Sequence, residues 1–561
     1  MIKFFKKILI SFVLSCSIIS HSEITDKQLK NYTEKLDKLV IKAMKQFEIP
    51  GATYVISRKN KIIHEASFGF TDFNKKKEVE DDTLFPLASL SKNVAAFLVG
   101  ALVDDGVLKF EDKVRKYLPS FFLWSEEISN EMTIQDLISF GSGFKHFSGD
   151  TLFCSGYSKE KILAAFKYLK PKPGEFRTTY AYQNVIFGMV GDVIQNATGE
   201  LYEDLVQKYI FDKLKMNDSS AIPLEYEESF FGYVKYRTSR FAHESKKLGF
   251  FKASIDFLKS IFSHKTKKCV SQHSKYENTV EILPKVGFFH KFPSTCGISF
   301  SAKDFGKWIA MVSGGGSYNG VQIVSPQTFK KLTSKMVEVK NIRDDDSTFP
   351  KERISRQNFN YGMGTFIANY GDNGKHEKPI IFHMGGIYGA SAFFAADLKD
   401  DISIGVICNL GGVSHTQFTE RIVFQFLDLC LNFSDIDWIQ YEIDEKEKMQ
   451  NMQMEYYTNL KDSNVAAMDK AEYYVGTYTS SIYGDVTITL ENDELFLSNG
   501  IKKTKLKHVN RDMFEFPCKD MMFSYHNTKE YAMFSRSNPG NKFDSLNVSC
   551  FHEQKNQFKR K

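Results

Sequence analysis

The sequence lacks several features that would assign it to a simple class of protein. Its 8 cysteines in 561 residues include no Cys-x-x-Cys pair and no His/Cys cluster with zinc-site spacing. Beyond the first 22 residues, no uninterrupted apolar run is long enough to span a bilayer. Internal repeats and low-complexity tracts are also lacking. These absences argue against a zinc-stabilised fold, a membrane-spanning mature chain and a repeat architecture, and we expect no metal site.

The chain also lacks a large excess of charge of one sign. It holds 74 basic and 68 acidic residues, and residues 1–22 contribute three of the lysines but no acid. The remainder gives no reason to expect a nucleic-acid partner. The basic stretch Lys246–Lys268 is interpreted as a solvated surface insertion. With 42% hydrophobic residues over this length, we expect a soluble globular protein of two or three domains.

The N-terminus has the pattern of an export signal. Three lysines within the first seven residues precede an apolar core over residues 8–19 and small residues at 20–22. This core is too short to remain as a spanning helix. We therefore predict a signal peptide over residues 1–22 and a periplasmic or secreted protein. A lipoprotein-type cleavage before Cys16 is the second-ranked interpretation.

Periodicity along the chain predicts an α+β domain followed by a small all-β domain. A helix over 26–47 precedes a hairpin, helical segments dominate from about 89 to 198, and strands return over 380–410. Early and late strands around a helical middle predict an antiparallel sheet flanked by helices, completed by both ends of the domain, with a helical subdomain. Residues 225–293 fit no clean pattern. The expected boundaries are 1–22 for the signal, 23–435 for the α+β domain, 436–470 for a helical linker and 471–561 for the β domain.

Ser89 and Lys92 head an apolar helical run that continues to Gly106. Serine at a helix start is ordinarily a cap, and this interpretation stays open for Ser89 and Ser91. A cap does not explain Lys92, because the helix dipole disfavours a cation in the first turn and apolar surroundings favour loss of its proton. The i, i+3 spacing puts both side chains on one helix face, which predicts a nucleophile and its base.

Two other Ser-x-x-Lys matches have less suitable settings. Ser142–Lys145 lies in a glycine-broken loop, and Ser158–Lys161 begins a charged, solvated helix. A second candidate element is Tyr182-Gln183-Asn184, between a Pro-Gly loop and an amphipathic helix. This setting exposes Tyr182 and Asn184 at the edge of a cleft. The alternative for Tyr182 is a half-buried core aromatic.

A third candidate element follows a predicted strand of the late group. His383 ends this strand, and Met384, Gly385 and Gly386 come next. Glycine lets a substrate approach the backbone closely, so the N–H of Gly386 is a candidate oxyanion donor. The alternative is an ordinary strand turn with an exposed histidine.

Taken in chain order, Ser-x-x-Lys, Tyr-x-Asn and His-x-Gly resemble the serine β-lactamase-related family. That family comprises class C β-lactamases, penicillin-binding proteins, and esterases and D-aminopeptidases of the same fold. The stretches "TLFPLASLSKNVAAFLVGALVDDGVLKFEDKVRKYLPSF" and "HMGGIYGASAFFAAD" also look like the family. The resemblance covers about residues 25–433, with 225–293 poorly matched. It implies a β-lactamase/transpeptidase-like fold, and "YYVGTYTSSIYGDVTITL" looks like the small β domain often appended to it.

The resemblance also implies a mechanism. Ser89 attacks a carbonyl, Lys92 and Tyr182 share its proton, and the N–H groups of Ser89 and Gly386 bind the oxyanion. Water then hydrolyses the acyl-enzyme, and no metal or organic cofactor is needed. The residues implied to bind substrate are Asn184, His383 and Gly385, and the alternative role for Asn184 is to hold Lys92.

One departure from the family pattern bears on the substrate. Class C β-lactamases and transpeptidases carry Lys-Thr-Gly where this chain has His383-Met384-Gly385, which is more similar to the esterase and peptidase branches. The leading hypothesis is an exported serine hydrolase that cleaves an ester, amide or D-amino-acid peptide, with a small molecule or peptide as its partner. The alternatives are a class C-like β-lactamase or peptidoglycan DD-carboxypeptidase, and a non-catalytic penicillin- or peptidoglycan-binding protein. The oligomeric state stays open.

Overall fold

The fold comes from a computed structural model of the chain. It describes residues 24–561 except 75, 172–173, 277–278, 284–290, 341–347, 356, 373–376, 412–416, 462–466, 522–528, 539 and 552–556. The predicted signal peptide and Cys16 lie outside the described residues. No disulfide joins any of the seven cysteines among the described residues, so Cys518 and Cys550, which share the β domain, are not bonded to each other.

The larger domain is built on an antiparallel sheet that both ends of the domain complete. The early strand β1 pairs with the late strand β15 in a register that sets Ala52 opposite Cys408. This confirms the prediction of a sheet closed by distant segments. In sheet order, the strands are β10 (Val337–Glu338), β11 (Asn360–Tyr361), β12 (Phe366–Tyr370), β13 (Lys378–Ile387), β14 (Ala390–Asp397), β15 (Ile402–Cys408), β1 (Gly51–Arg58), β2 (Lys61–Asp72) and β3 (Lys77–Glu78).

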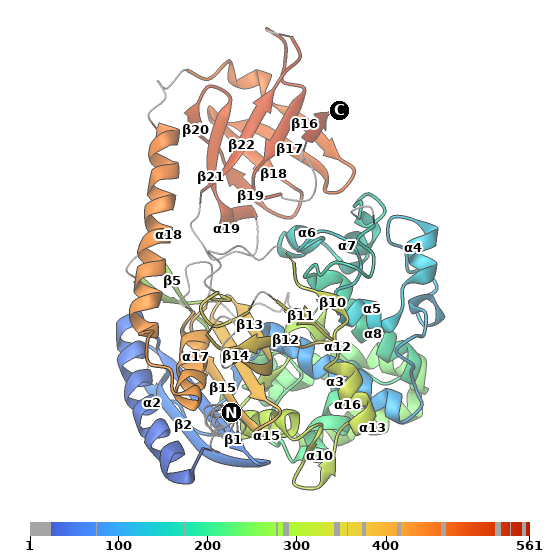
Figure 1. The fold of residues 1–561 in the computed structure, drawn as a ribbon. Coiled ribbons are helices and arrows are strands. Elements are labelled where there is room, and N and C mark those ends of the chain that lie inside the picture. The colour runs from blue at the N-terminus through green and yellow to red at the C-terminus, as the bar shows by residue number, and fades with distance from the viewer. Residues whose placement is uncertain are drawn as a thin grey trace, which may run out of the picture.

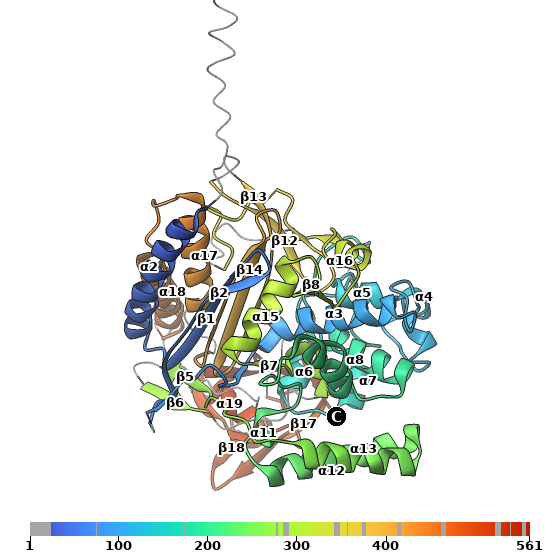
Figure 2. The ribbon, with the colours of Figure 1, turned by 90° about the horizontal axis from the view of Figure 1, so that it is seen from below.

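Helices cover both faces of this sheet (Figures 1 and 2). On one face lie α2 (Asp26–Phe47) and α17 (Phe418–Leu431), which contact each other, and α17 packs on β14 and β15. On the other face, α15 (Ala302–Ser313) packs on β1, β2, β14 and β15. The sheet strands β1, β14 and β15 are buried along their whole length, because both of their faces are covered.

The helical subdomain lies beside the sheet, and α3 (Ser91–Asp104) lies between the two. Every residue of α3 from Ser91 to Leu102 is buried, as expected for a helix surrounded by protein. The subdomain helices are α4 (Glu126–Glu131), α5 (Ile134–Ile138), α6 (Asp150–Cys154), α7 (Lys159–Ala165), α8 (Asn184–Thr198) and α9 (Tyr202–Val206).

The segment without a clear sequence pattern forms a helical hairpin. Its elements are α11 (Leu224–Glu227), α12 (Phe230–Leu248), α13 (Phe250–Ser263), β5 (His273–Tyr276) and β6 (Thr279–Ile282). Figure 2 shows α12 and α13 side by side at the edge of the molecule, away from the large sheet.

A second antiparallel sheet forms the C-terminal β domain at the top of Figure 1, which α18 (Trp438–Lys461) joins to the larger domain. The fold class predicted from the sequence, an α+β β-lactamase/transpeptidase-like domain with a small all-β domain, is confirmed. None of the described helices is both long and apolar enough to cross a membrane. The strands of the second sheet, in chain order, are β16 (Gly476–Ser480), β17 (Gly484–Glu491), β18 (Glu494–Ser498), β19 (Lys503–Lys505), β20 (Lys507–Asn510), β21 (Met513–Pro517), β22 (Lys529–Ser535), β23 (Ser545–Val548) and β24 (Gln557–Arg560).

Candidate active site

Ser89 lies in a short 3₁₀ turn, Ala88–Leu90, immediately before α3. The helix begins at Ser91, two residues later than the sequence suggested. Ala88 holds a φ of 50°, a left-handed conformation that is uncommon for a residue with a side chain. Ser91 is no cap, because its Oγ accepts a hydrogen bond from the N–H of Ile298 at 3.1 Å. The turn leaves Ser89 half-exposed while its neighbours are buried.

Lys92 is fully buried one helical turn beyond Ser89. Its Nζ donates to Ser89 Oγ at 3.1 Å, to Asn184 Oδ1 at 2.7 Å and to the carbonyl of Thr295 at 3.2 Å. Burial disfavours the charged form and lowers the pKa of the Lys92 ammonium to about 7. A substantial fraction of Lys92 is therefore neutral near pH 7, which suits a proton acceptor next to a hydroxyl.

Tyr182 approaches Ser89 from the helical subdomain. Its hydroxyl donates to Ser89 Oγ at 2.5 Å, and Lys92 Nζ lies 4.8 Å from the centre of its ring. Burial raises the pKa of Tyr182 well above its ordinary value, so the free protein holds the phenol protonated. The structure thus brings together Ser89, Lys92, Tyr182 and Asn184, which were singled out from two distant stretches of sequence.

Asp150 at the start of α6 belongs to this cluster, although no local motif marks it. Asn184 Nδ2 donates to Asp150 Oδ2 at 2.5 Å, which turns the amide oxygen of Asn184 toward Lys92. Burial raises the pKa of Asp150 to about 7, and its Oδ1 is buried with no hydrogen-bond partner among the described residues. Asp150 is a positioning residue: it fixes the amide orientation of Asn184 and its charge raises the pKa of Lys92.

We expect Asp150→Asn to move the acidic limb of the acylation rate to lower pH. The side-chain oxygen of asparagine still accepts from Asn184, but the lost negative charge no longer stabilises the Lys92 ammonium, so the pKa of Lys92 falls further. The measurement is kcat/KM against pH with a neutral ester. Asp192→Asn, which removes a carboxylate paired with Lys159 at 2.6 Å, is the control and should leave the limb in place. An unmoved limb in Asp150→Asn would contradict the electrostatic role.

The third candidate element lies on β13, an interior strand of the large sheet. His383 is fully buried; its Nδ1 lies 2.8 Å from the carbonyl of Met384, and its Nε2 accepts from the Tyr361 hydroxyl at 3.1 Å. Burial and the nearby Lys92 lower the pKa of His383 to about 3, so the imidazole is neutral at physiological pH. The alternative of a strand turn with an exposed histidine is therefore wrong, because the side chain lies within the sheet and contacts Tyr361. The assignment of His383 to substrate binding stays a prediction.

The glycines after His383 bring β13 against the Ser89 turn. A Cβ at Gly385 would lie 2.0 Å from the carbonyl oxygen of Leu87 and 2.9 Å from the backbone nitrogen of Ser89. Only glycine permits this approach. Gly386, next along the strand, is exposed. The assignment of the Ser89 and Gly386 N–H groups as the oxyanion hole stays a prediction.

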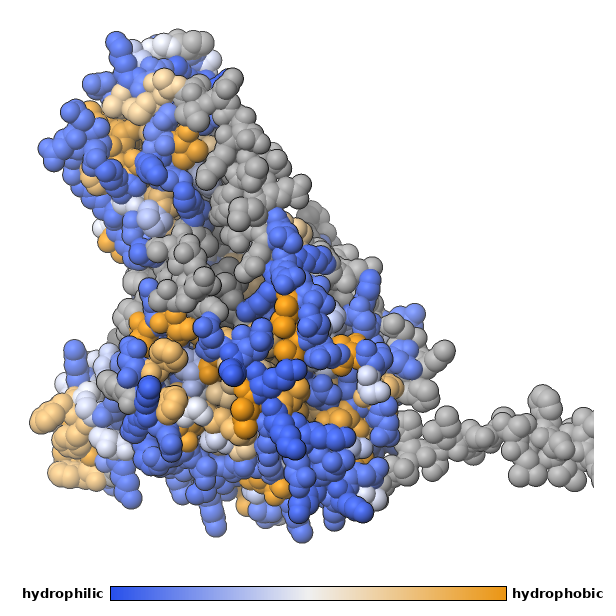
Figure 3. Space-filling view, turned by 90° about the vertical axis from the view of Figure 1, so that its left-hand side faces the viewer, coloured by the Kyte–Doolittle hydropathy of each residue, from blue (hydrophilic) through white to orange (hydrophobic). Residues whose placement is uncertain are grey.

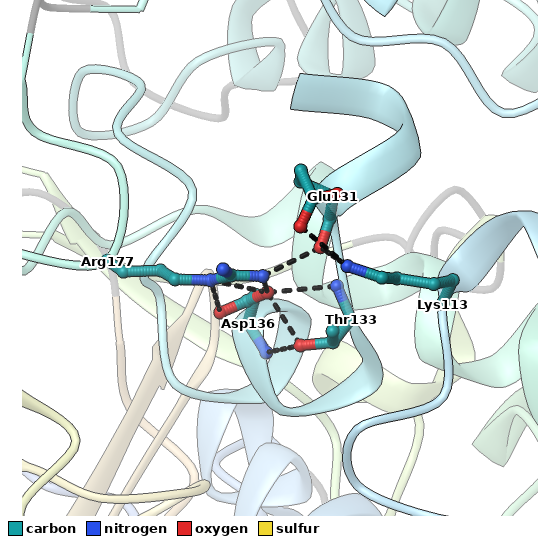
Figure 4. A network of polar contacts seen from close by, with 5 residues as sticks. All are labelled: Lys113, Glu131, Thr133, Asp136 and Arg177. Carbon is teal, nitrogen blue, oxygen red and sulfur yellow. Dashed lines mark hydrogen bonds and ion pairs between the residues drawn. The ribbon is translucent and has the colours of Figure 1, made fainter. Parts of the chain in front are cut away.

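A polar network fixes the segment that leads to Tyr182 (Figure 4). Arg177 donates from Nε and Nη2 to the carboxylate of Asp136 at 2.9 and 2.8 Å, and from Nη2 to the carbonyl of Glu131 at 2.7 Å. The same carboxylate accepts from the backbone N–H and hydroxyl of Thr133, which caps α5. Lys113 pairs with the Glu131 carboxylate at 2.7 Å. Asp136 thus ties the chain just before Tyr182 to the start of α5.

We expect Asp136→Asn to lower the free energy of unfolding by about 1–3 kcal/mol. The Asp136 carboxylate is buried, so losing its charge weakens the five hydrogen bonds that Arg177 and Thr133 donate to it. The partial exposure of Arg177 keeps the effect below that of a fully buried pair. Urea unfolding followed by circular dichroism measures it. Glu126→Gln, at a solvent-exposed pair with Arg115, is the control and should leave the free energy of unfolding nearly unchanged. Equal effects in both variants would contradict the anchoring role.

A family model described as Beta-lactamase matches residues 36–423. The chain belongs to the Beta-lactamase family. A second model, a domain of unknown function named DUF3471, matches residues 460–560, which include the whole C-terminal sheet. Within the described part of the chain, no group of three His, Cys, Asp or Glu side chains is placed to hold a metal ion.

Two named relatives of this Beta-lactamase family member are remote in sequence. Protein flp of Staphylococcus aureus (strain COL) is 22% identical over 400 residues, an alignment that covers 70% of this chain and 66% of that protein. Penicillin-binding protein 4* of Bacillus subtilis (strain 168) is 26% identical over 199 residues, or 32% of this chain and 41% of that one. The chain thus spans just under two thirds of flp.

Two solved structures share the fold of this chain at low sequence identity. The octameric penicillin-binding protein homologue from Pyrococcus abyssi superposes with a TM-score of 0.53 and 17% identity, covering 94% of this chain and 99% of that one. A class C beta-lactamase superposes with a TM-score of 0.50 and 14% identity, covering 71% of this chain and 96% of that one. Both likenesses concern the fold alone.

Proposed function

We propose that this protein is an exported serine hydrolase that cleaves an ester, amide or D-amino-acid peptide bond through an acyl-enzyme on Ser89. The observation that carries the proposal is the convergence of two proton-carrying groups on one hydroxyl: Lys92 Nζ at 3.1 Å and Tyr182 Oη at 2.5 Å from Ser89 Oγ. A cap or a core tyrosine has no need of this arrangement. Membership of the Beta-lactamase family supports the same conclusion.

The proposed reaction follows from these positions. Ser89 Oγ attacks the substrate carbonyl while its proton passes to neutral Lys92, and the Tyr182 hydroxyl, hydrogen-bonded to the same oxygen, donates a proton to the leaving group. The N–H groups of Ser89 and Gly386 stabilise the oxyanion. Tyr182 then regains a proton from the Lys92 ammonium, and a water molecule hydrolyses the ester bond to Ser89 and restores the free serine. Asn184 holds the Lys92 amine in line with Ser89 throughout.

The His383-Met384-Gly385 element supports a substrate that has no carboxylate beside these residues. His383 is neutral and buried, and Met384 has no hydroxyl, so neither side chain offers the charge-assisted hydrogen bond that Lys-Thr-Gly supplies in class C β-lactamases. Such a bond contributes about 1.5–3 kcal/mol, or roughly ten- to a hundredfold in specificity. We therefore propose short-chain esters, uncharged amides or D-amino-acid peptides as the substrate class, rather than β-lactams.

The test compares kcat/KM for a p-nitrophenyl ester, a D-alanyl amide and a cephalosporin. We expect the ester or the D-alanyl amide to be hydrolysed faster than the cephalosporin, and the Ser89→Ala variant to be inactive on all three. A faster cephalosporin rate would favour the alternative of a class C-like β-lactamase or DD-carboxypeptidase. Stable labelling by penicillin without turnover of any substrate would favour a non-catalytic penicillin- or peptidoglycan-binding protein.

Export is a separate part of the proposal and rests on residues 1–22 alone. Lysines before a short apolar core and small residues support cleavage near Glu23. N-terminal sequencing of protein from the cell envelope should begin there. A lipid-modified Cys16 would favour the lipoprotein alternative, and an uncleaved product in the cytoplasm would overturn both.

A further inference from the structure

The hairpin formed by α12 and α13 is fastened to the body along one side. On α12, Tyr236 donates to a Glu203 carboxylate oxygen at 2.7 Å, and Arg237 pairs with Asp204 at 2.9 Å. Both carboxylates belong to α9. The two helices close on each other where the rings of Tyr233 and His264 stack with centres 3.7 Å apart. The polar side of α12 thus faces protein, which leaves α13 on the outside.

The outward side of the hairpin is apolar, contrary to the expectation of a solvated insertion. On α13, four side chains follow one another at i, i+4, i+7 and i+11, a spacing that puts them on a single helix face. Their exposed fractions are large: Phe251 79%, Ile255 38%, Leu258 51% and Phe262 85%. Phe231 at the start of α12 is 84% exposed. Pale orange side chains gather at the lower left of Figure 3, where this hairpin projects from the body.

Positive charge accompanies this apolar face. Residues 229–268 hold ten basic and two acidic residues, but several of these cations, Arg237 among them, pair with carboxylates of the body. The helix α13 itself carries two lysines and one aspartate. Lys252 and Lys259 are exposed and follow Phe251 and Leu258 directly, so both lysines flank the same side of the stripe one heptad apart. Exposed phenylalanine and leucine bordered by lysine are typical of a helix that lies in the plane of a membrane surface.

We infer that the apolar stripe of α13 docks onto an anionic phospholipid bilayer, with its phenylalanines at the level of the headgroups and acyl chains and its lysines against the headgroup phosphates. The positive charge that flanks the stripe favours this occupant over a second copy of the chain, because a symmetric contact would set lysines against lysines. The helix lies on the bilayer and does not cross it, since α13 has only 14 residues. The inference does not depend on the proposed hydrolysis.

The test is co-sedimentation of the full chain with two kinds of lipid vesicle, one of phosphatidylcholine alone and one with added phosphatidylglycerol. We expect binding to the anionic vesicles only. Phe251→Ser/Phe262→Ser should weaken it at least tenfold, because each phenylalanine loses its place in the apolar layer. Lys252→Gln/Lys259→Gln should weaken it by roughly fivefold per lysine and reduce its sensitivity to salt.

A matched control distinguishes binding through the α13 stripe from nonspecific binding through other exposed apolar side chains. Ile41→Ser/Phe73→Ser removes two side chains that are 55% and 49% exposed elsewhere, and should leave vesicle binding unchanged. Equal binding to both vesicle types, no binding, or equal loss in the control variant would overturn the inference. A wild-type protein that is oligomeric and binds no vesicles, together with a monomeric Phe251→Ser/Phe262→Ser variant, would also overturn the inference. The apolar face would then form contacts between copies of the chain.

Discussion

Replacing Lys92 by methionine is expected to slow acylation of Ser89 by roughly a hundred- to ten-thousandfold without loss of the fold. Methionine has a similar length and no charge, so it fills the buried site without the desolvation that lowers the lysine pKa to about 7. In the wild type, acylation should increase as pH rises through about 7, because only unprotonated Lys92 accepts the serine proton. The variant should lose this dependence. Stopped-flow labelling with a fluorophosphonate across pH measures both.

Lys161→Met is the matched control for this prediction. Lys161 stands in the same Ser-x-x-Lys spacing after Ser158, but its Nζ donates to the carbonyl of Tyr483 in the β domain at 3.1 Å. We expect wild-type acylation in this control. A Lys92→Met protein that is folded and acylates at the wild-type rate would remove Lys92 from the reaction.

Tyr182→Phe should lower kcat by roughly a hundred- to ten-thousandfold. The phenylalanine ring keeps the contacts with Phe140 and Phe147, whose ring centres lie 4.8 and 5.4 Å away, so the site keeps its shape. What is lost is the hydroxyl 2.5 Å from Ser89 Oγ, and with it the proton donor for the leaving group. The rise of activity through pH 7 should persist, since Lys92 is unchanged. Steady-state kinetics with esters of differing leaving-group pKa measure the effect.

The loss of kcat in Tyr182→Phe should be largest for esters with poor leaving groups, because these need protonation most. Tyr180→Phe serves as the control, because it removes the hydroxyl of another packed tyrosine only two residues earlier. It should retain near-wild-type kcat. Equal losses in Tyr180→Phe and Tyr182→Phe, or a loss independent of the leaving group, would contradict the role of the Tyr182 hydroxyl.

The sequence predicted those parts of the site that depend on local geometry. Ser89 and Lys92 lie one helical turn apart, so their spacing alone puts them on one face. Tyr182 and Asn184 lie at a loop-to-helix junction, which the Pro-Gly signal marks. The fold brings Tyr182 and Asn184 next to Ser89. Local sequence patterns do not predict this proximity, which the family resemblance implied.

The parts that the sequence missed depend on packing between distant segments. Asp150 reaches Asn184 only because α6 lies beside the start of α8, and no local motif marks it. The burial of His383 depends on Tyr361 of β11, which lies two strands away in the sheet. The α12–α13 hairpin was missed because polar side chains of α12 face the protein and the apolar stripe of α13 faces outward, the reverse of the ordinary globular pattern.

Peptide mass spectrometry after labelling with a fluorophosphonate shows whether Ser89 is the nucleophile. We expect one labelled peptide, with the added mass on Ser89, and no labelling of the Ser89→Ala variant. A label on Ser142 or Ser158, or labelling that persists in Ser89→Ala, would contradict it.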